Sequence, residues 1–296
     1  MKILGIGDNV ADRYVRQQLM YPGGQAMNFA AVGRMLGAHA AFLGVFGNDE
    51  ISDHNMSVLD ELGVDRSRCR RYVGDNGFAF VDQHEGDRIF LGSNKGGALR
   101  EHPLELGEDD IDYCKAFDWI HTSNNSYLDN KLPKLKMTGI PLSYDFSTSW
   151  RTRGDFEEIC CGLELAFLSG DGDSAEALDG VADMMLSFGC KSAIITMGAG
   201  GALFRARGLS LHEPAHKTEV LDTMGAGDAF LAGFVTCCPE TGNSEKRFIV
   251  EARMRAGAQA AAKTCRNFGA FGYGKDDPGG IAALEKNRKV SHLWDT

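Results

Sequence analysis

Short apolar runs alternate with longer segments of helical periodicity along most of the chain. Residues 2–6 predict a buried strand, and residues 25–36 predict a helix, because Met27, Ala31 and Met35 recur at helical spacing before Gly37. The same pattern predicts further strands at residues 40–46, 119–123, 142–146, 166–169 and 192–197, a hairpin at 202–206 and 209–212, and helices at 51–62, 174–188 and 246–263. This alternation indicates an α/β fold with a mostly parallel sheet covered by helices on both faces.

The pattern changes between residues 71 and 97, where short β-like runs at 72–73, 77–81 and 88–91 are separated by Gly, Asp and Asn. Glu85-Gly86-Asp87 predicts a hairpin turn within this region. We expect these runs to form a small antiparallel flap inserted in the larger fold, with an added strand from residues 13–18. Residues 273–296 are polar and predict a tail to which the sequence assigns no role.

Length and charge narrow the possible functions. The 296 residues allow one large α/β domain or two smaller ones. A net charge of −10 without a Lys/Arg cluster argues against nucleic acid as the main partner, although a small anion could still bind to backbone amides. No apolar run approaches the length of a membrane span, and the first apolar run meets Asp8 too early for a signal peptide.

The cysteine pattern indicates the compartment. None of the eight cysteines forms a Cys-x-x-Cys motif, and two pairs are directly adjacent, which suits neither a zinc site nor a disulfide framework. Several lie in apolar segments, as buried free thiols do. We therefore expect free thiols and a reducing cytoplasm. The eight positions are Cys69, Cys114, Cys160, Cys161, Cys190, Cys237, Cys238 and Cys265.

The stretch from Asp222 to Phe230 carries the strongest chemical signal. Gly225, Ala226 and Gly227 stand before Asp228, and an apolar helical run follows at once. Glycines let a ligand approach the backbone, and the unpaired N–H groups of a helix start attract anions such as phosphate. A carboxylate at such a site suits a general base that takes a proton from a hydroxyl about to be phosphorylated. In isolation, the motif favours a plain turn with an acidic residue in the first turn of a helix.

Two further glycine turns frame possible ligand sites. Thr196, Gly198 and Gly201 follow a predicted strand, where an open α/β sheet binds ligands and where a nucleotide could lie against the backbone. No Gly-Lys-Ser/Thr motif accompanies them, so a nucleotide site here would not be a P-loop. A purely structural turn is an equally common explanation.

The other glycine turn, Gly23-Gly24, opens the first long helix, in which Asn28 is a polar residue among apolar neighbours. Asn28 either caps the helix locally or reaches a ligand hydroxyl. Asp8, Asn9 and Asp12 follow the first strand and suit sugar hydroxyls, or else form an Asx-rich turn.

Two further residues, Arg88 and His121, each have two possible roles. Arg88 in the flap either contacts an acidic group of a substrate or is a solvated surface residue. His121 ends a predicted strand, and we expect it to be a core histidine rather than a cleft residue.

With these residues in view, the chain resembles the ribokinase (PfkB) family of carbohydrate kinases from about residue 2 to residue 272. The resemblance rests on Gly23-Gly24 through Asn28 to Gly37 and Gly47, and on the run from Asp222 to Asp228. Within the family the chain is most similar to the fructosamine kinases that phosphorylate fructoselysine at O6, through Gly7-Asp8-Asn9, Gly86-Asp87-Arg88, Tyr144-Asp145-Phe146-Ser147 and Gly269-Ala270.

The resemblance implies roles for individual residues. Asp228 matches the catalytic base, and the amides of Gly225, Ala226 and Gly227 match the anion hole for the transferred phosphoryl group. The implied sugar-binding positions are Asp8, Asp12, Gly23, Gly24, Asn28 and Arg88, and the implied nucleotide-binding positions are Thr196, Gly198, Gly201 and Gly269. Asp222 and Thr223 lie where several members bind a monovalent cation such as K⁺.

One departure concerns magnesium. Many family members carry Asn-x-x-Glu after the strand that corresponds to residues 166–168, whereas this chain has Ser169-Gly170-Asp171-Gly172-Asp173. Magnesium is held mostly by water and by one or two carboxylates. Asp171 or Asp173 would therefore help to hold Mg²⁺.

The resemblance implies a ribokinase-like three-layer α/β sandwich, a single kinase domain over residues 1–296, whose β lid comes from about 11–20 and 71–98. It also implies an ATP- and Mg²⁺-dependent kinase of a sugar hydroxyl, with O6 of fructoselysine as the expected acceptor, and a homodimer formed through the lid. The alternatives are a kinase for ribose, fructose, a 2-keto-3-deoxy sugar acid or a nucleoside, or a catalytically silent sugar-binding regulator. A dinucleotide-dependent dehydrogenase fits poorly, because the first strand lacks Gly-x-Gly-x-x-Gly.

Overall fold

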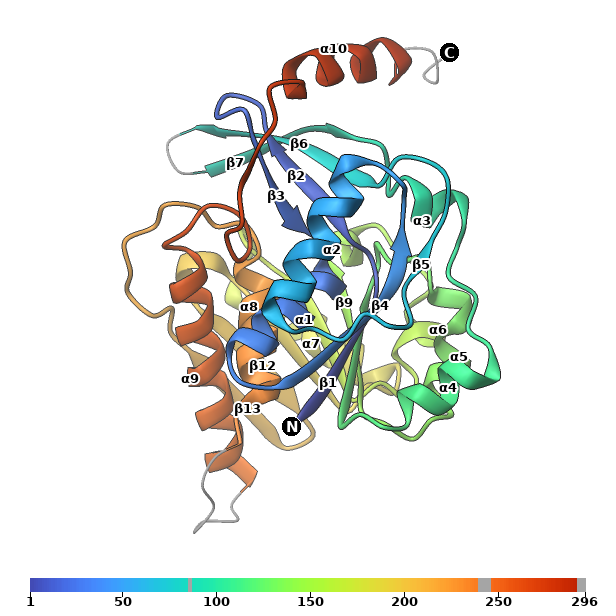
Figure 1. Cartoon of the computed structure of the whole chain (residues 1–296). Coiled ribbons are helices and arrows are strands. Elements are labelled where there is room, and N and C mark those ends of the chain that lie inside the picture. The colour runs from blue at the N-terminus through green and yellow to red at the C-terminus, as the bar shows by residue number, and fades with distance from the viewer. Residues whose placement is uncertain (85–86, 239–245, 292–296) are drawn as a thin grey trace.

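A large, mostly parallel β-sheet forms the centre of the computed structural model, which describes residues 1–84, 87–238 and 246–291 (Figure 1). Its inner strands run parallel, and only the hairpin at one edge is antiparallel. In spatial order the described strands are β13 (Leu209–Glu213), β12 (Ala202–Ala206), β11 (Ser192–Thr196), β10 (Leu165–Ser169), β9 (Leu142–Ser147), β8 (Trp119–Ser123), β1 (Lys2–Gly7), β4 (His39–Phe46) and β5 (Arg70–Arg71). The predicted strands and the hairpin around Gly208 are confirmed.

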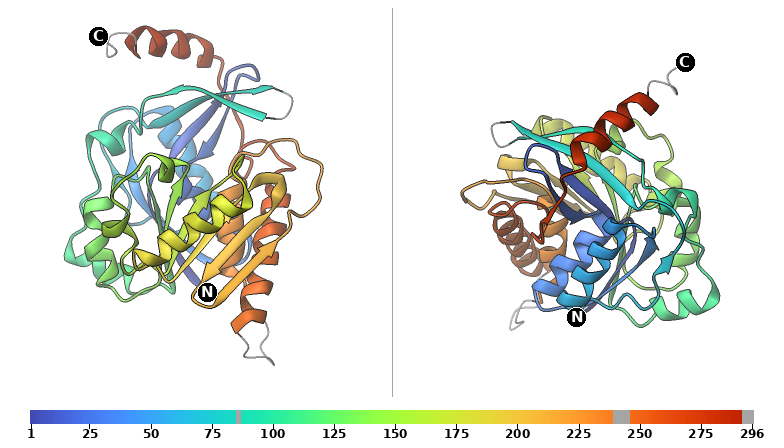
Figure 2. Two further views of the ribbon diagram at one scale, coloured as in Figure 1. Left: turned by 180° about the vertical axis from the view of Figure 1, so that it is seen from behind. Right: turned by 45° about the horizontal axis from the view of Figure 1, so that its top comes forward.

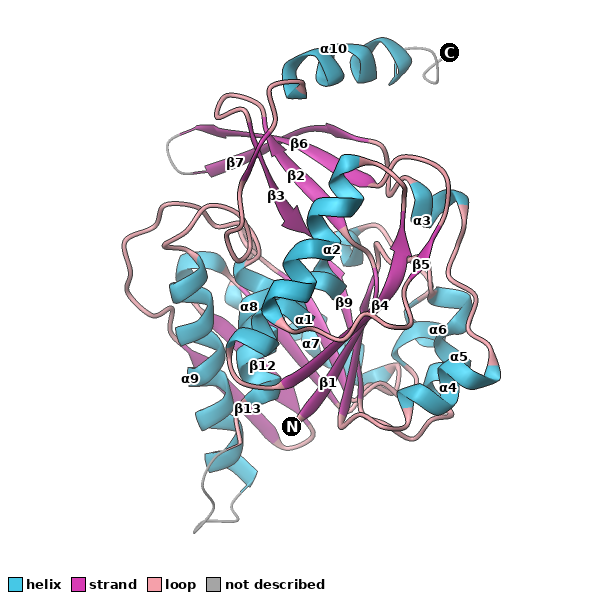
Figure 3. Ribbon diagram, in the orientation of Figure 1, coloured by secondary structure: helices cyan, strands magenta, loops and turns pink. Residues whose placement is uncertain are grey.

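Helices cover both faces of this sheet, which gives the three layers that the sequence predicts (Figure 3). One face packs against α1 (Gln25–Met35), α2 (Glu50–Leu62), α8 (Ala226–Thr236) and α9 (Lys246–Thr264). The other face packs against α3 (Ala98–Glu101), α4 (Glu108–Cys114), α5 (Leu132–Lys136), α6 (Phe156–Cys160) and α7 (Ala175–Ser187). Alternation along β10 shows the principle, since Phe167 belongs to the first apolar cluster while Ala166 and Leu168 belong to the second. Short 3₁₀ turns cover Asp129–Lys131, Ser149–Arg151 and Gly198–Gly200.

A smaller sheet, called the second sheet below, lies over the carboxyl ends of the parallel strands (Figure 1). Its described strands, in spatial order, are β14 (Lys275–Asp276), β3 (Leu19–Gly23), β2 (Val10–Tyr14), β6 (Gly77–His84) and β7 (Asp87–Ser93). Only β2 and β6 pair in parallel. The flap expected from the sequence therefore exists, but it also includes β3 and β14, which the apolar pattern did not predict.

Two of the expected flap strands are placed wrongly. The strand expected at residues 13–18 ends at Tyr14, because residues 15–18 form the turn to β3 and Gln18 adopts a positive φ of 53°. Residues 72–73, expected to be a flap strand, form no strand; the strand just before them, β5, ends at Arg71 and pairs with β4 of the large sheet. The predicted turn at Glu85-Gly86-Asp87 falls partly on residues 85–86, which lie outside the described residues.

The tail is attached to the second sheet. Strand β14 pairs with β3, and the Arg13 guanidinium donates two hydrogen bonds of 2.7 Å to the Asp277 carboxylate. Helix α10 (Gly280–Ser291) then crosses above the second sheet, as two further views show (Figure 2). Its Leu284 packs with Val15 and Phe80. The tail thus covers part of the outer side of the second sheet.

Candidate active site

A cavity of about 1240 Å³ lies between the carboxyl ends of the parallel strands and the second sheet. Most of the residues that the sequence singles out line it: Asp8, Asp12, Gly24, Asn28, Asp171, Thr196, Gly198, Gly201, Thr223, Gly225, Ala226, Gly227 and Asp228. Four others do not, namely Gly23, Asp173, Asp222 and Gly269. Arg88 belongs to β7, but its side chain lies outside the described part of the chain. The structure therefore brings together motifs that are up to 220 residues apart in sequence.

The turn before α8 exposes its backbone to this cavity. Gly225 caps the helix with a left-handed φ of 70°, and a Cβ there would lie 2.3 Å from the Cβ of Ala270. Only glycine fits this position without strain. The Ala226 N–H donates to the Thr223 carbonyl oxygen at 3.2 Å, which closes the turn.

Asp228 lies in the first turn of α8 and is 8% exposed. The Asn28 Nδ2 of α1 donates to its Oδ2 at 2.6 Å. Helices α1 and α8 pack against each other, so this hydrogen bond joins two neighbouring helix starts at the cavity wall. Position at a helix N-terminus favours a negative charge on the carboxylate. The arrangement places a carboxylate, an amide and a glycine turn side by side at the cavity wall.

Asp222 connects the turn to the second sheet. Its fully buried carboxylate accepts hydrogen bonds from the Tyr14 hydroxyl, from the Met224 N–H at 3.0 Å and from the Gly269 N–H at 2.9 Å. Tyr21 packs with Tyr14 and Met224. Burial raises its pKa, and the nearby charge of Asp222 raises it further. Thr223 lines the cavity, whereas the Asp222 side chain holds three parts of the fold together, and the cation role expected for both residues stays a prediction.

Asp8 caps α1 from a neighbouring strand end. Gly24 at the N-cap has no side chain to offer, and the Asp8 carboxylate accepts from the N–H groups of Gln25 (2.7 Å) and Ala26 (3.1 Å). The hydroxyls of Ser123 and Ser126 donate to the same carboxylate. Asp8 therefore lines the cavity while its oxygens are already bonded to protein groups.

Glycines make room around the neighbouring residues of this wall. A Cβ on Gly23 would lie 2.4 Å from the Asp12 carboxylate, and one on Gly24 would lie 2.7 Å from the Asn9 Cα. This close approach accounts for the Gly23-Gly24 pair, and it lets Asp12 reach the cavity although Gly23 itself does not.

Asp145 is a cavity residue that the analysis of sequence patterns did not assign a role. It lies near the carboxyl end of β9, is 4% exposed, and accepts from the Gln25 Nε2 at 2.7 Å and from the Ser147 N–H at 2.6 Å. The Asn125 Nδ2 donates in turn to the Gln25 Oε1 at 2.9 Å. Burial, and secondly the charge of Asp8, raise the pKa of Asp145 to about 7, although its two hydrogen bonds act in the opposite direction. Its position at the carboxyl end of a parallel strand was the available signal.

The glycine turn that contains Gly198 and Gly201 forms another part of the cavity wall. Gly201 has a φ of 89°, and a Cβ there would lie 2.2 Å from the Glu213 carbonyl oxygen. Small residues of α9, among them Ala258, Ala261 and Ala262, line the same side. Gly198 and Gly201 both line the cavity.

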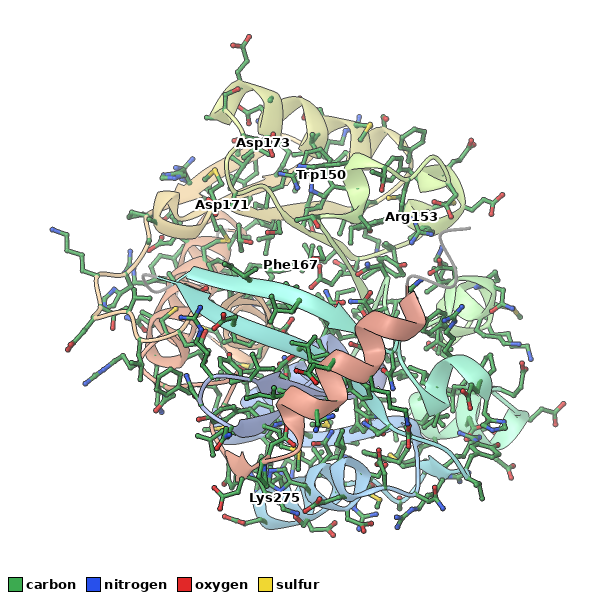
Figure 4. All side chains as sticks on the ribbon, turned by 90° about the horizontal axis from the view of Figure 1, so that it is seen from above. Trp150, Arg153, Phe167, Asp171, Asp173 and Lys275 are labelled. Carbon is green, nitrogen blue, oxygen red and sulfur yellow. The ribbon has the colours of Figure 1, made fainter. Side chains whose placement is uncertain are left out.

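The two aspartates expected near magnesium are placed differently. Asp171 lines the cavity beside Gly198, whereas Asp173 is paired with the Arg151 guanidinium and does not line it. Seen from above, both lie on the same side of the second sheet as Trp150 (Figure 4). Among the described residues no group of three or more His, Cys, Asp or Glu side chains forms a metal site. Magnesium that keeps most of its water needs no such group, so Asp171 fits this ion.

His121 lies in the core, as the sequence predicts. It is fully buried, its Nδ1 lies 3.0 Å from the Ser143 Oγ, and burial lowers its pKa to about 3. It does not line the cavity.

All eight cysteines are free thiols, as expected. Among the described helices, none is both long enough and apolar enough to cross a membrane.

Comparison with known proteins gives consistent results. A family model described as pfkB family carbohydrate kinase matches residues 5–138 and 161–272. The fructosamine kinase FrlD of Bacillus subtilis (strain 168) is 39% identical over 275 residues, which cover 93% of this chain and 94% of that protein. The fructoselysine 6-kinase of Escherichia coli (strain K12) is 28% identical over 272 residues, which cover 92% of this chain and 100% of that protein.

The fold is similar to that of a solved ribokinase. The structure of Arabidopsis thaliana ribokinase complexed with ribose and ATP has a TM-score of 0.73, with 19% identity over 96% of this chain and 98% of that chain. These similarities do not favour a dehydrogenase or a catalytically silent regulator.

Proposed function

We propose, since this chain belongs to the pfkB family of carbohydrate kinases, that its acceptor is a fructosamine such as fructoselysine and that it phosphorylates O6. The chain is an ATP-dependent phosphotransferase that acts on a hydroxyl of a sugar derivative. The choice of a fructosamine rests on the names of the two kinases to which it is 39% and 28% identical. The geometry that carries the proposal is the hydrogen-bonded pair of Asn28 and Asp228 beside the Gly225 turn.

In the proposed reaction Asp228 acts as the general base. Its carboxylate takes the proton of the O6 hydroxyl while that oxygen forms a bond to the γ-phosphorus of ATP. The bond between this phosphorus and the β,γ-bridging oxygen breaks, and ADP leaves with that oxygen. Asn28 orients the carboxylate through its hydrogen bond of 2.6 Å.

The amides of Gly225, Ala226 and Gly227 are proposed to stabilise the charge that develops on the transferred group. One such donor is worth about 3 kcal/mol, by analogy with an oxyanion hole. The Ala226 N–H already donates to the Thr223 carbonyl oxygen within the turn. The proposal therefore relies mainly on the amides of Gly225 and Gly227.

The donor is proposed to lie on the side of Thr196, Gly198 and Gly201, where α9 presents small side chains. Mg²⁺, when bound, neutralises charge on the phosphates. We assign its protein contact to Asp171, because Asp171 lines the cavity whereas Asp173 is paired with Arg151. Gly269 would act indirectly through Asp222, and a monovalent cation such as K⁺ would bind beside Thr223.

The second sheet is proposed to serve as a lid of a single kinase domain. Closing over the cavity, it would exclude water and so suppress hydrolysis of ATP. Strand β7 forms one edge of this sheet and carries Ile89 and Phe90, which are 47% and 58% exposed. We propose that a homodimer forms through this edge, since α10 covers the outer side near Val15 and Phe80. Arg88 on β7 stays a predicted contact for a substrate carboxylate, and the eight free thiols fit the cytoplasm.

An acceptor panel tests the proposed substrate. Purified protein with ATP and Mg²⁺ is offered fructoselysine, fructose, ribose, a 2-keto-3-deoxy sugar acid and a nucleoside, and release of ADP is measured. We expect fructoselysine to have a kcat/KM at least about tenfold above any other acceptor. Turnover of a different acceptor with higher efficiency, or of none, would contradict the fructosamine proposal.

A further inference from the structure

We infer that Asp145 is the carboxylate that pairs with the charged nitrogen of the acceptor and so selects an aminated sugar over a plain ketose. This inference rests on the proposed function and extends it, because it identifies a subsite for the substituted ammonium group at C1 of a fructosamine. The residues that build the subsite are Gln25, Asn125 and Asp145, and all three line the cavity.

The carboxylate is held in a fixed position. Asp145 stands at the carboxyl end of β9, where the Ser147 N–H binds one oxygen at 2.6 Å and the Gln25 Nε2 binds the other at 2.7 Å. Asn125 fixes the Gln25 amide from its other side at 2.9 Å. Each carboxylate oxygen can accept a further hydrogen bond. The Asp145 carboxylate is therefore oriented toward the cavity, and it can still accept hydrogen bonds from a ligand.

Helix α1 links this subsite to the reacting end of the cavity. Gln25 bonds Asp145, and Asn28, three residues later on the same helix, bonds Asp228. Side chains at this spacing lie on one face, with their β-carbons about 5–6 Å apart. The two carboxylates are thus held on either side of a short stretch of helix. C1 and C6 are the two terminal carbons of a ketohexose. When O6 lies at Asp228, a substituent on C1 therefore points away from Asp228 and toward Asp145.

The charge balance points to a cation from the ligand. Asp145 is buried close enough to Asp8 for their charges to interact, and no ion pair among the described residues includes either one. Buried carboxylates are normally paired with a cation. Burial raises the pKa of Asp145 to about 7, as expected for a carboxylate without one. An ammonium group of the acceptor would supply the missing positive charge.

Replacement of the carboxylate by its amide tests this pairing. In Asp145→Asn we expect kcat/KM for fructoselysine to fall about 10- to 100-fold, mainly through KM, because a charge-assisted hydrogen bond in a desolvated site is lost. For fructose we expect a change of less than about threefold, since no cation is involved. Asp60→Asn is the matched control, because Asp60 is paired with Arg66 on the exposed surface of α2. It should alter neither value.

A second measurement needs no variant, so it remains decisive if Asp145→Asn does not fold. Wild-type enzyme is compared on fructoselysine and on a 1-O-alkyl fructose of equal length, in which an ether oxygen replaces the amine. The inference predicts at least about tenfold weaker binding of the ether by calorimetry. Equal binding of the ether and the amine, or an equal loss for both acceptors in Asp145→Asn, would overturn it.

The two proposals fail in different ways. If fructoselysine is phosphorylated and Asp145→Asn keeps its preference over fructose, the subsite is wrong while the proposed function stands. If fructoselysine binds more tightly to the wild type than to Asp145→Asn but no ADP forms, the proposed function is wrong while the subsite stands. If fructoselysine does not bind at all, both are wrong.

Discussion

Two buried carboxylates line the same cavity in contrasting surroundings. Asp228 lies at the start of a helix beside a glycine turn, where backbone N–H groups and the helix dipole favour negative charge. Asp145 lies at the end of a strand close to Asp8, where burial raises its pKa to about 7. Each is held by an amide side chain of the first turn of α1. The difference indicates that the first site suits an anionic phosphoryl group, whereas the second suits a cation.

The largest expected effect is at the reacting end. Asp228→Asn removes the proposed base but keeps the shape of the side chain, so kcat should fall about 1000-fold for every acceptor. Binding of ATP should change by no more than about twofold. Steady-state kinetics and calorimetry measure the two quantities, and retention of more than about a tenth of the rate would refute the role of Asp228 as base.

The glycine turn gives the next largest effect. Gly225→Ala adds a Cβ that would lie 2.3 Å from Ala270 at a φ of 70°, so the turn must shift. We expect a loss of about 1–3 kcal/mol in unfolding free energy and a 10- to 100-fold lower kcat with all acceptors.

Gly180→Ala is the control for this variant, because Gly180 lies within α7 with open space around its Cβ position. It should stabilise the protein by about 0.5–1 kcal/mol without a change in kcat. A Gly225→Ala enzyme with normal kcat would contradict the close approach of a ligand to this turn.

Replacing the two amide side chains of α1, Asn28 and Gln25, distinguishes the two ends of the cavity most clearly. Asn28→Ala should lower kcat about tenfold for both fructoselysine and fructose, because it removes the Asn28 amide that donates to the Asp228 carboxylate at 2.6 Å. Gln25→Ala should raise KM for fructoselysine several-fold and leave fructose unaffected, because the Gln25 amide, itself held by Asn125, orients the Asp145 carboxylate. The same response of both acceptors to both variants would remove the distinction between the ends.

The effect with the smallest consequence for activity concerns stability and its dependence on pH. The folded-state pKa of Asp145 is about 7 against an unfolded value near 4, so ionised Asp145 opposes folding. Its stabilising contribution is present below pH 4 and is lost as pH rises through 7. Without ligand, Asp145→Asn should therefore be more stable than the wild type at pH 8, by roughly 1–4 kcal/mol.

Thermal melts at pH 8 and pH 5 measure this difference, which should shrink at the lower pH. A variant that is less stable than the wild type at pH 8 would mean that Asp145 serves mainly to hold the fold together.

The apolar pattern predicted the large sheet well, because strands such as β10 and helices such as α7 carry clear periodicity. It was less successful for the second sheet, where β3 and β14 are short and where β14 pairs with β3 across more than 250 residues of sequence. The turn at residues 15–18 interrupts a run that reads as one strand. Strand pairing between remote segments leaves little local signal in a short polar sequence.

The candidate site likewise contains residues that local sequence marks and contacts that only the fold creates. Asp228 and Asn28 were found because glycine turns mark them in the sequence. The partnership of Gln25 with Asp145 joins residues 120 positions apart, and no local pattern reveals it. Asp222 and Asp8 were expected at ligands; their oxygens bind the Tyr14 hydroxyl and the first N–H groups of α1, although Asp8 also lines the cavity. Tertiary contacts alone separate carboxylates that hold the fold from those that face the cavity.

The position of the transferred phosphate tests the central claim most directly. Wild-type enzyme is incubated with fructoselysine, ATP and Mg²⁺, and the product is analysed by ³¹P and ¹³C NMR. The account predicts a single phosphomonoester coupled to C6, formed in equal amount with ADP, and absent when Asp228→Asn replaces the wild type. A phosphate on another carbon, or release of ADP without a sugar phosphate, would contradict it.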